Sequence, residues 1–161
     1  MKLILKADRL IDGSSTKVMT DAAVVIEGDT ISKVCSQSEL TETELDDARV
    51  IDSSDGTLMP GFIEMHSHIH CSAESDAYTH ITTETNETFL LRGSQAVRSS
   101  LSSGVTTMRD LGSRNEVVFP LRQSIEDGII PGPRLLVAGT PITTTGGHCN
   151  TFGTEADSSD Q

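Results

Sequence analysis

Residues 60–68 read PGFIEMHSH. The Pro-Gly pair is typical of a turn, and the compact apolar run that follows it is typical of a buried parallel strand. Residues i and i+2 of a strand point to the same face, so His66 and His68 are expected to project side by side from its end. Two neutral imidazoles suit a divalent metal such as zinc, although a complete site takes three or four ligands.

The rest of residues 60–161 alternates between strand and helix signals. Strands are predicted at 62–65, 105–108 and 135–138, and helices at 90–101, capped by Gly104, and from about 119 to Gly128. This alternation predicts βα units and a parallel sheet, but the order does not by itself separate a barrel from an open sheet. An eight-unit barrel uses ~31 residues per unit. The 100 residues from Phe62 to Gln161 would therefore hold about three of eight units.

Residues 1–59 instead carry short β-branched clusters and no long helical period. Strands are predicted at 3–5, 22–27 and 31–34, and a fourth begins at 50–52, with turns at 28–29 and at Asp55-Gly56. We therefore predict a small β domain at 1–59 and a second domain of the α/β class at 60–161.

The charge of the chain excludes several kinds of partner. Its 161 residues carry a formal net charge of −12, which argues against binding to nucleic acid or to an anionic membrane. No segment approaches the ~20 apolar residues of a membrane span, and no secretory signal is visible. The three cysteines are few, odd in number and widely spaced, so no disulfide framework is predicted. We expect a cytoplasmic protein.

Residues 60–68 resemble the signature of the amidohydrolase superfamily, in which a Pro-Gly turn, an apolar strand and an acidic residue precede the His-x-His metal ligands. Glu64 stands where Asp is commoner. Residues 104–112 and 132–148 resemble the second and third strands of the imidazolonepropionase-like branch, which includes prolidase-like enzymes that cleave Xaa-Pro dipeptides. The resemblance covers nearly the whole chain. It implies a small β domain followed by the first three βα units of a TIM-like (β/α)8 barrel, which is truncated here.

The resemblance also implies roles for particular residues. His66 and His68 are expected to be metal ligands, and a complete enzyme would hold one or two divalent ions, with zinc the expected metal. His148 and Asp110 are expected to contact substrate or to orient a metal ligand. For His148 the alternative is a loop histidine bonded to backbone, and for Asp110 it is capping or an ion pair with Arg109.

No catalytic residue can be assigned. Complete relatives take a lysine, usually carbamylated, from the fourth strand, histidines from the fifth and sixth, and a catalytic aspartate from the eighth. All four lysines of this chain lie within residues 1–59. His70 continues the alternation of His66 and His68, but the family pattern does not require it. His80 is expected in a solvated polar loop. Cys149 is not expected to act as a nucleophile, because adjacent residues such as His148 rarely face each other in attack geometry.

Two functions are consistent with these features. In the first, the chain is by descent a metal-dependent hydrolase of amide or other carbon–nitrogen bonds, acting on a small molecule or dipeptide, and is a gene fragment or half of a split enzyme. In the second, it is a non-enzymatic remnant that binds metal weakly or oligomerises. In both, we predict no turnover by the isolated chain. A complementing polypeptide or a homo-oligomer would be needed to cover the exposed strand edge.

Overall fold

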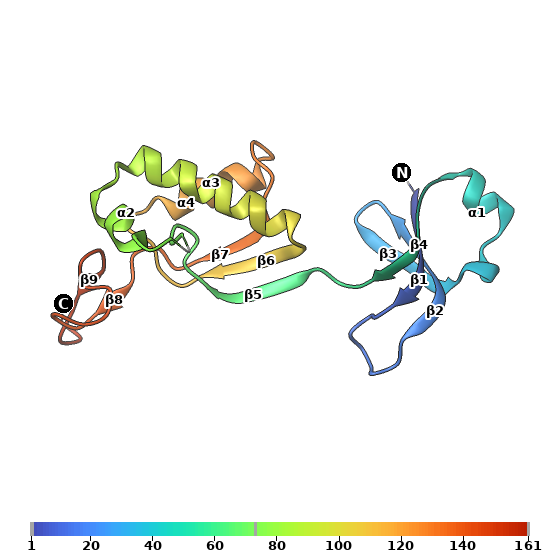
Figure 1. The fold of residues 1–161 in the computed structure, drawn as a ribbon, viewed down its shortest axis with the longest axis horizontal. Coiled ribbons are helices and arrows are strands. Elements are labelled where there is room, and N and C mark those ends of the chain that lie inside the picture. Colours follow the sequence, from blue (N-terminus) through green and yellow to red (C-terminus); the bar gives the residue numbers. More distant parts are fainter. Residues whose placement is uncertain (1, 73, 161) are drawn as a thin grey trace. The chain divides into compact units, whose positions relative to one another are not determined.

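The structure is a computed structural model that describes residues 2–72 and 74–160. The chain divides into two compact units, Met1–Pro60 and Gly61–Gln161. Figure 1 labels the elements of both units. Among the described residues, no helix has the length and apolar character that crossing a membrane requires.

The first unit is built on a four-stranded sheet in the order β3-β2-β1-β4. The strands are β1 (Lys2–Leu10), β2 (Met19–Glu27), β3 (Thr30–Ser36) and β4 (Ala48–Leu58). Neighbours among the first three are antiparallel, whereas β4 runs parallel to β1. Parallel strands cannot be joined by a tight hairpin. The chain accordingly passes from β3 to β4 through a longer connection, which contains a 3-10 helix, η1 (Gln37–Glu39), and a short helix, α1 (Glu42–Asp46).

A capping box explains where α1 begins. The hydroxyl of Thr41 accepts from the backbone N–H of Glu44 at 3.2 Å, and the Glu44 carboxylate accepts from the N–H of Thr41 at 2.9 Å. Lys33 on β3 places its ammonium 3.2 Å from the same carboxylate. The hydrogen bonds from Thr41, followed by the contact with Lys33, lower the pKa of Glu44 to about 2.

The turn predicted at Asp55-Gly56 is wrong, because β4 continues through it. Ala7 lies opposite Ser53 and Arg9 lies opposite Thr57, so β4 contains more residues than β1 between these two pairs. The residues that favour a turn form an irregularity in the strand instead, as glycine often does at a bulge.

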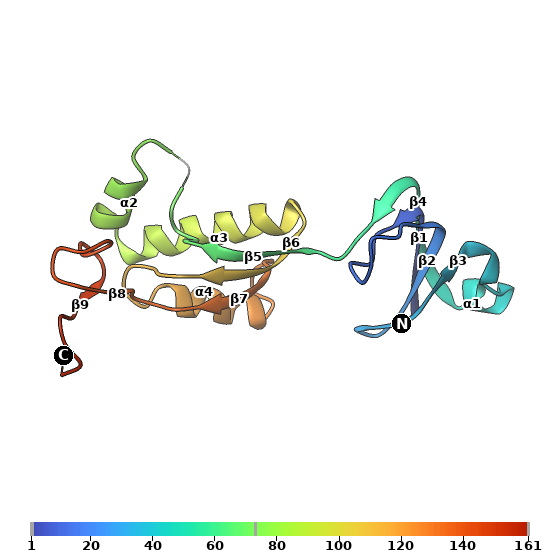
Figure 2. The ribbon, with the colours of Figure 1, turned by 90° about the horizontal axis from the view of Figure 1, so that it is seen from below.

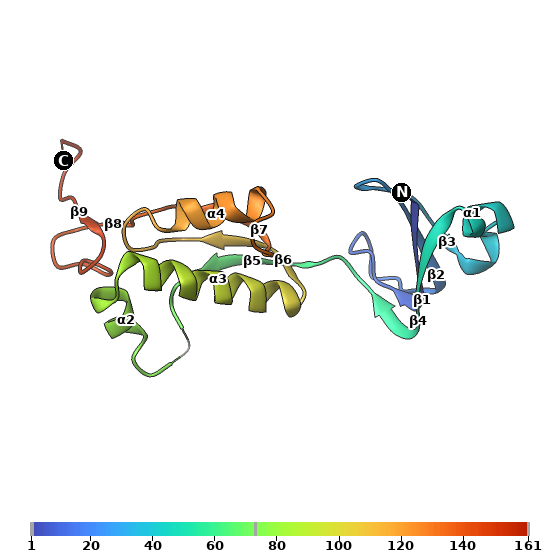
Figure 3. The ribbon, with the colours of Figure 1, turned by 90° about the horizontal axis from the view of Figure 1, so that it is seen from above.

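The second unit contains a parallel sheet in the order β5-β6-β7. Its strands are β5 (Phe62–Ser67), β6 (Val105–Asp110) and β7 (Arg134–Val137), and the helices α3 (Asn86–Ser102) and α4 (Val118–Glu126) connect them. Both helices lie on the same face of this sheet (Figures 1 and 3). The core between sheet and helices is formed by Ile69, Val97, Met108, Val118, Leu121 and Leu135.

The three strands and two helices predicted after residue 60 are confirmed, with ends that differ by a few residues. The side chain of Thr85 caps α3, which begins at Asn86, four residues before the predicted start at residue 90. A further helix, α2 (Ala77–Thr83), was not predicted. It contains His80, whose Nδ1 lies 2.8 Å from Oε1 of Glu84, so the prediction of a solvated loop there is wrong.

The segment after β7 forms a small parallel pair that the sequence did not predict. Its strands are β8 (Ile142–Thr143) and β9 (Thr154–Glu155), which follow β7 along the chain (Figure 2). The loop of residues 144–153 that joins them carries His148. Side-chain oxygens of Asp157 and Glu155 accept from the backbone N–H groups of Thr145 and Gly146 and so fix the start of this loop.

Candidate metal centre

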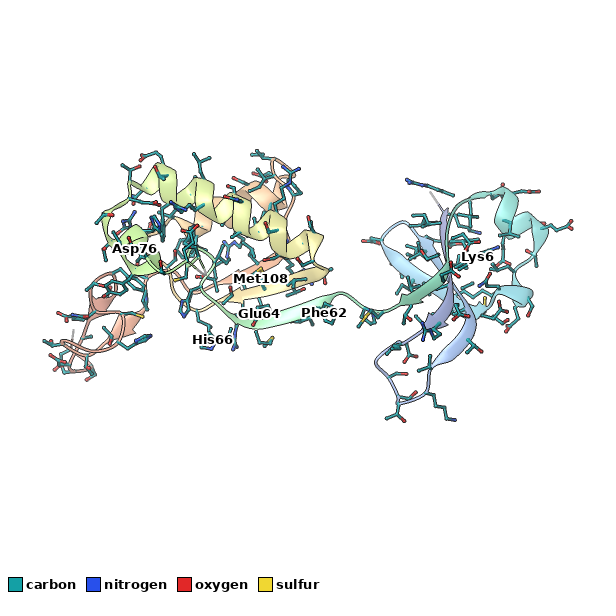
Figure 4. All side chains as sticks on the ribbon, viewed as in Figure 1. Lys6, Phe62, Glu64, His66, Asp76 and Met108 are labelled. Carbon is teal, nitrogen blue, oxygen red and sulfur yellow. The ribbon has the colours of Figure 1, made fainter. Side chains whose placement is uncertain are left out.

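A bulge near the end of β5 sets the direction of His66. Glu64 lies opposite Met108 and Ser67 lies opposite Asp110, so two residues of β5 face a single residue of β6 between these pairs. Paired residues of parallel strands point to the same face, and Met108 points into the core beneath α3 and α4. The extra residue keeps Ser67 on the face of Asp110 and turns His66 to the opposite, open face. In Figure 4, His66 projects on the side of the sheet away from α3.

His66 and His68 lie next to each other at this strand end. Their ring centroids are 5.5 Å apart and the ring planes are inclined by 70°. The Nδ1 atom of His68 lies 3.0 Å from the carbonyl oxygen of Gly112. Because a carbonyl oxygen only accepts, Nδ1 carries the hydrogen, and Nε2 of the neutral ring keeps its lone pair. The fold therefore selects the tautomer of His68 that can bind a metal through Nε2.

Asp110 connects the two backbone segments that hold His68. Its Oδ1 accepts from the N–H of Ile69 at 3.0 Å, and its Oδ2 accepts from the N–H of Gly112 at 3.3 Å. Asp110 is 0% exposed. Burial raises the pKa of its carboxyl group, against the opposing effect of these two hydrogen bonds and of His68. Arg109 does not serve as its partner here, since the Arg109 Nε–H donates to the carbonyl oxygen of Met65 at 2.7 Å.

His148 reaches the same region from the loop between β8 and β9. With His68 it lines a cavity of about 380 Å³, whose walls also include Tyr78, Ile81 and Phe152. The loop is tightly turned, and a Cβ atom at Gly147 would clash with the side chains of neighbouring threonines. The structure thus brings His68 and His148 to one cavity, while His66 lies beside His68 on the open face.

His70 is not part of this group. Its ring stacks on Phe89 with centroids 4.3 Å apart, and its Nδ1 lies 2.9 Å from Oγ of Ser113. Burial, followed by the nearby positive charge of Arg114, lowers the pKa of His70 to about 4. The neutral ring fills space against Gly93 of α3, where a Cβ would lie 2.5 Å from its Nε2. His70 is therefore a core residue beneath the site.

Among the described residues, His66 and His68 are the candidate metal ligands. Within residues 2–72 and 74–160, no group of three or more His, Cys, Asp or Glu side chains is placed to hold an ion. The imidazoles of His66 and His68 could supply two nitrogen ligands, and a complete site needs at least one more protein ligand.

Residues 57–161 match the model of the amidohydrolase family, and the chain therefore belongs to that family. Ochratoxinase from Aspergillus niger is 29% identical over 154 residues, which cover 92% of this chain and 30% of the relative. The crystal structure of A. niger ochratoxinase gives a TM-score of 0.76, with 26% identity over 91% of this chain and 33% of that one.

A Xaa-Pro dipeptidase solved with methionine in its active site gives a TM-score of 0.83, with 32% identity over 98% of this chain and 38% of that chain. This chain thus spans about a third of the length of these relatives. The resemblance to the prolidase-like amidohydrolases is confirmed. Members of the superfamily are generally metal-dependent, but these similarities do not specify which metal.

Proposed function

We propose that this chain contributes two metal ligands, His66 and His68, to the active site of a hydrolase that cleaves amide or other carbon–nitrogen bonds. One observation carries the proposal: the Gly112 carbonyl accepts from Nδ1 of His68 and leaves Nε2 free to bind a metal. The divalent ion expected there is zinc. When bound, such an ion lowers the pKa of a coordinated water and polarises the scissile carbonyl group.

The arrangement of the second unit supports a (β/α)8 barrel as its fold. Its three strands are parallel, stand in sequence order and have both connecting helices on one face. A doubly wound sheet instead reverses its strand order and carries helices on both faces. We infer that residues 61–161 form the first three βα units of the barrel. His66 and His68 then lie at the carboxyl ends of its strands, where barrel enzymes place their chemistry.

The residues of this chain bind the metal and position other groups, and none of them is assigned a chemical step. Asp110 and Gly112 hold His68 in its orientation, and His148 lines the cavity beside it, where it can contact a substrate. Likeness to a Xaa-Pro dipeptidase and to ochratoxinase supports a dipeptide or another small amide as substrate. We further propose that the 161-residue chain alone does not turn over, because two ligands fall short of a catalytic site.

A non-enzymatic role is the second candidate, and a specific observation favours it. Apolar side chains are exposed on the open face of the sheet, with Ile63 at 62%, Met65 at 52% and Leu136 at 52%. A patch of this kind marks a surface that a second copy of the chain would cover in an oligomerising module. Sedimentation of the wild type beside an Ile63→Ser, Leu136→Ser variant separates the cases. Oligomers that the variant lacks would support an oligomerising module.

Zinc titration calorimetry tests the metal proposal. The wild type is expected to bind one ion weakly, and His66→Ala and His68→Ala are each expected to abolish that binding. His80→Ala is the matched control, because His80 pairs with Glu74 and Glu84 and does not line the cavity beside His68. Equal binding by all four proteins would mean that the histidine pair is not the site.

A further inference from the structure

The cavity beside His68 is walled by segments that lie far apart in the sequence. Tyr78 and Ile81 belong to α2, whereas Phe152 belongs to the loop between β8 and β9. The hydroxyl groups of Tyr78 and Thr151 are hydrogen-bonded at 2.5 Å and so link these two segments. Two aromatic rings and one aliphatic side chain therefore stand around a space that opens next to a proposed metal ligand.

The walls differ in how firmly they are held. Ile81 is 5% exposed and packs with Phe89 and Val117, and Phe152 packs against the same cluster. The backbone of Phe152 is further fixed by donation of its N–H to the carbonyl oxygen of Cys149 at 3.1 Å. Tyr78, in contrast, is 55% exposed and is held by its bond to Thr151. The cavity thus has a rigid floor and one wall with an exposed ring.

The volume of the cavity and the charge of its lining both indicate which kind of ligand could enter it. A dry cavity of about 150 Å³ lined by apolar side chains accepts benzene. At about 380 Å³, this cavity has room for an aromatic ring together with the amide group that carries it. Among the described lining residues, no lysine, arginine, aspartate or glutamate is found, and the ionisable groups are two imidazoles, two thiols and the phenol of Tyr78. The described lining therefore contains no permanently charged side chain to serve as a countercharge for an ionised group.

We propose that this cavity is a specificity pocket for an uncharged aromatic side chain of the substrate, with Tyr78 and Phe152 as its determining walls. The inference rests on the proposed function, since it places the pocket beside the metal ligand His68. Aromatic rings favour offset or edge-to-face packing with other rings, which two aromatic walls can supply. The substrate class is then an amide that carries a phenyl-like group, with its carbonyl directed toward His68.

Amide NMR titration of the chain in the presence of EDTA tests the pocket without any metal. The probes are N-acetyl-L-phenylalaninamide, N-acetylglycinamide and N-acetyl-L-aspartic acid amide. The phenylalanine probe is expected to shift the signals of Ile81, His148 and Phe152 saturably. Burial of the ring should make its dissociation constant at least about tenfold lower than that of the glycine probe. The aspartate probe should bind no better than the glycine probe.

Variants assign the binding to the two walls. Phe152→Ala and Tyr78→Ala are each expected to weaken the phenylalanine probe about three- to tenfold. Ile129→Ala removes a similarly apolar side chain that is 72% exposed and does not line the cavity, so its affinity should equal that of the wild type. If Phe152→Ala fails to fold, the affinity of Tyr78→Ala alone tests the pocket, because truncation of the largely exposed Tyr78 side chain should not unfold the chain.

Three results would overturn the pocket: equal affinity for the phenylalanine and glycine probes, unchanged affinity in the wall variants, or tighter binding of the aspartate probe. A wild-type spectrum without dispersion would do the same, because the cavity requires a folded second unit. None of these results bears on zinc binding by His66 and His68, which calorimetry measures separately.

Discussion

The Nδ1 atom of His68 donates to the carbonyl oxygen of Gly112 across 3.0 Å, although the two residues are 44 positions apart. The Asp110 carboxylate accepts from the N–H of Gly112 and from that of Ile69, the residue after His68. These three hydrogen bonds, together with the backbone that joins His68 to Ile69, therefore fix both the imidazole of His68 and the carbonyl group that orients it. Partners of this kind influence metal affinity without touching the metal.

Asp110→Asn should weaken both the fold and the metal site. The amide replaces one acceptor oxygen by a donor NH2 group and leaves one buried N–H without a partner, which costs ~1–3 kcal/mol. Zinc affinity is expected to fall about tenfold or more as His68 loses its orientation. Urea unfolding and calorimetry measure the two effects. Asp127→Asn, at an exposed position, is the control and should change neither. Wild-type zinc affinity in Asp110→Asn would show that the hydrogen bonds of Asp110 have no influence on metal binding by His68.

The stability of the chain should fall as the pH is lowered from about 6.5 towards about 4. The pKa of His70 is lowered from 6.5 to about 4 by burial, so the unfolded chain binds this proton first. The stabilisation from a neutral His70 is fully present above about 6.5 and is lost progressively below it, by ~3 kcal/mol at most. His70→Phe keeps a ring on Phe89 and removes the titration. With EDTA present, the pH dependence of urea unfolding should be flatter in this variant over that range. Identical slopes would mean that His70 does not titrate with folding.

The sequence was informative wherever local pattern decides structure. Apolar clusters located the three parallel strands, and the spacing of His66 and His68 indicated that their side chains would be neighbours. The bulge that turns His66 was not predictable, since it depends on pairing with β6, more than 40 residues away. Gly112 was missed for the same reason, because a backbone carbonyl leaves no signal in the sequence.

Local geometry also explains the position of His70. Strand alternation would have placed it beside His68, but β5 ends at Ser67 and the chain then turns, with the N–H of Cys71 donating to the carbonyl of His68 at 2.8 Å. The helix α2 went unpredicted because its sequence, AYTHITT, is rich in threonine, which has low helix propensity. The cavity wall made by Tyr78 and Phe152 follows from tertiary packing alone.

Purified alone with zinc, the 161-residue chain is expected not to hydrolyse alanyl-proline or phenylalanyl-proline above background. Catalysis needs a held metal, an activated water and a proton acceptor together, and their effects depend strongly on one another. Co-expression with a polypeptide that carries the remaining strands of the barrel should restore hydrolysis, and His66→Ala and His68→Ala should each remove it. Turnover by the isolated chain that depends on these two histidines would show that the chain is catalytically complete without a partner.

X-ray absorption at the zinc edge tests most directly whether His66 and His68 hold a metal together. The wild type is expected to show two imidazole nitrogens at ~2.0–2.1 Å from the zinc, with oxygen from water in the remaining positions. Each single alanine variant should leave at most one imidazole, and the double variant should leave none. A double variant that keeps the wild-type spectrum would show that the zinc is held by residues other than His66 and His68.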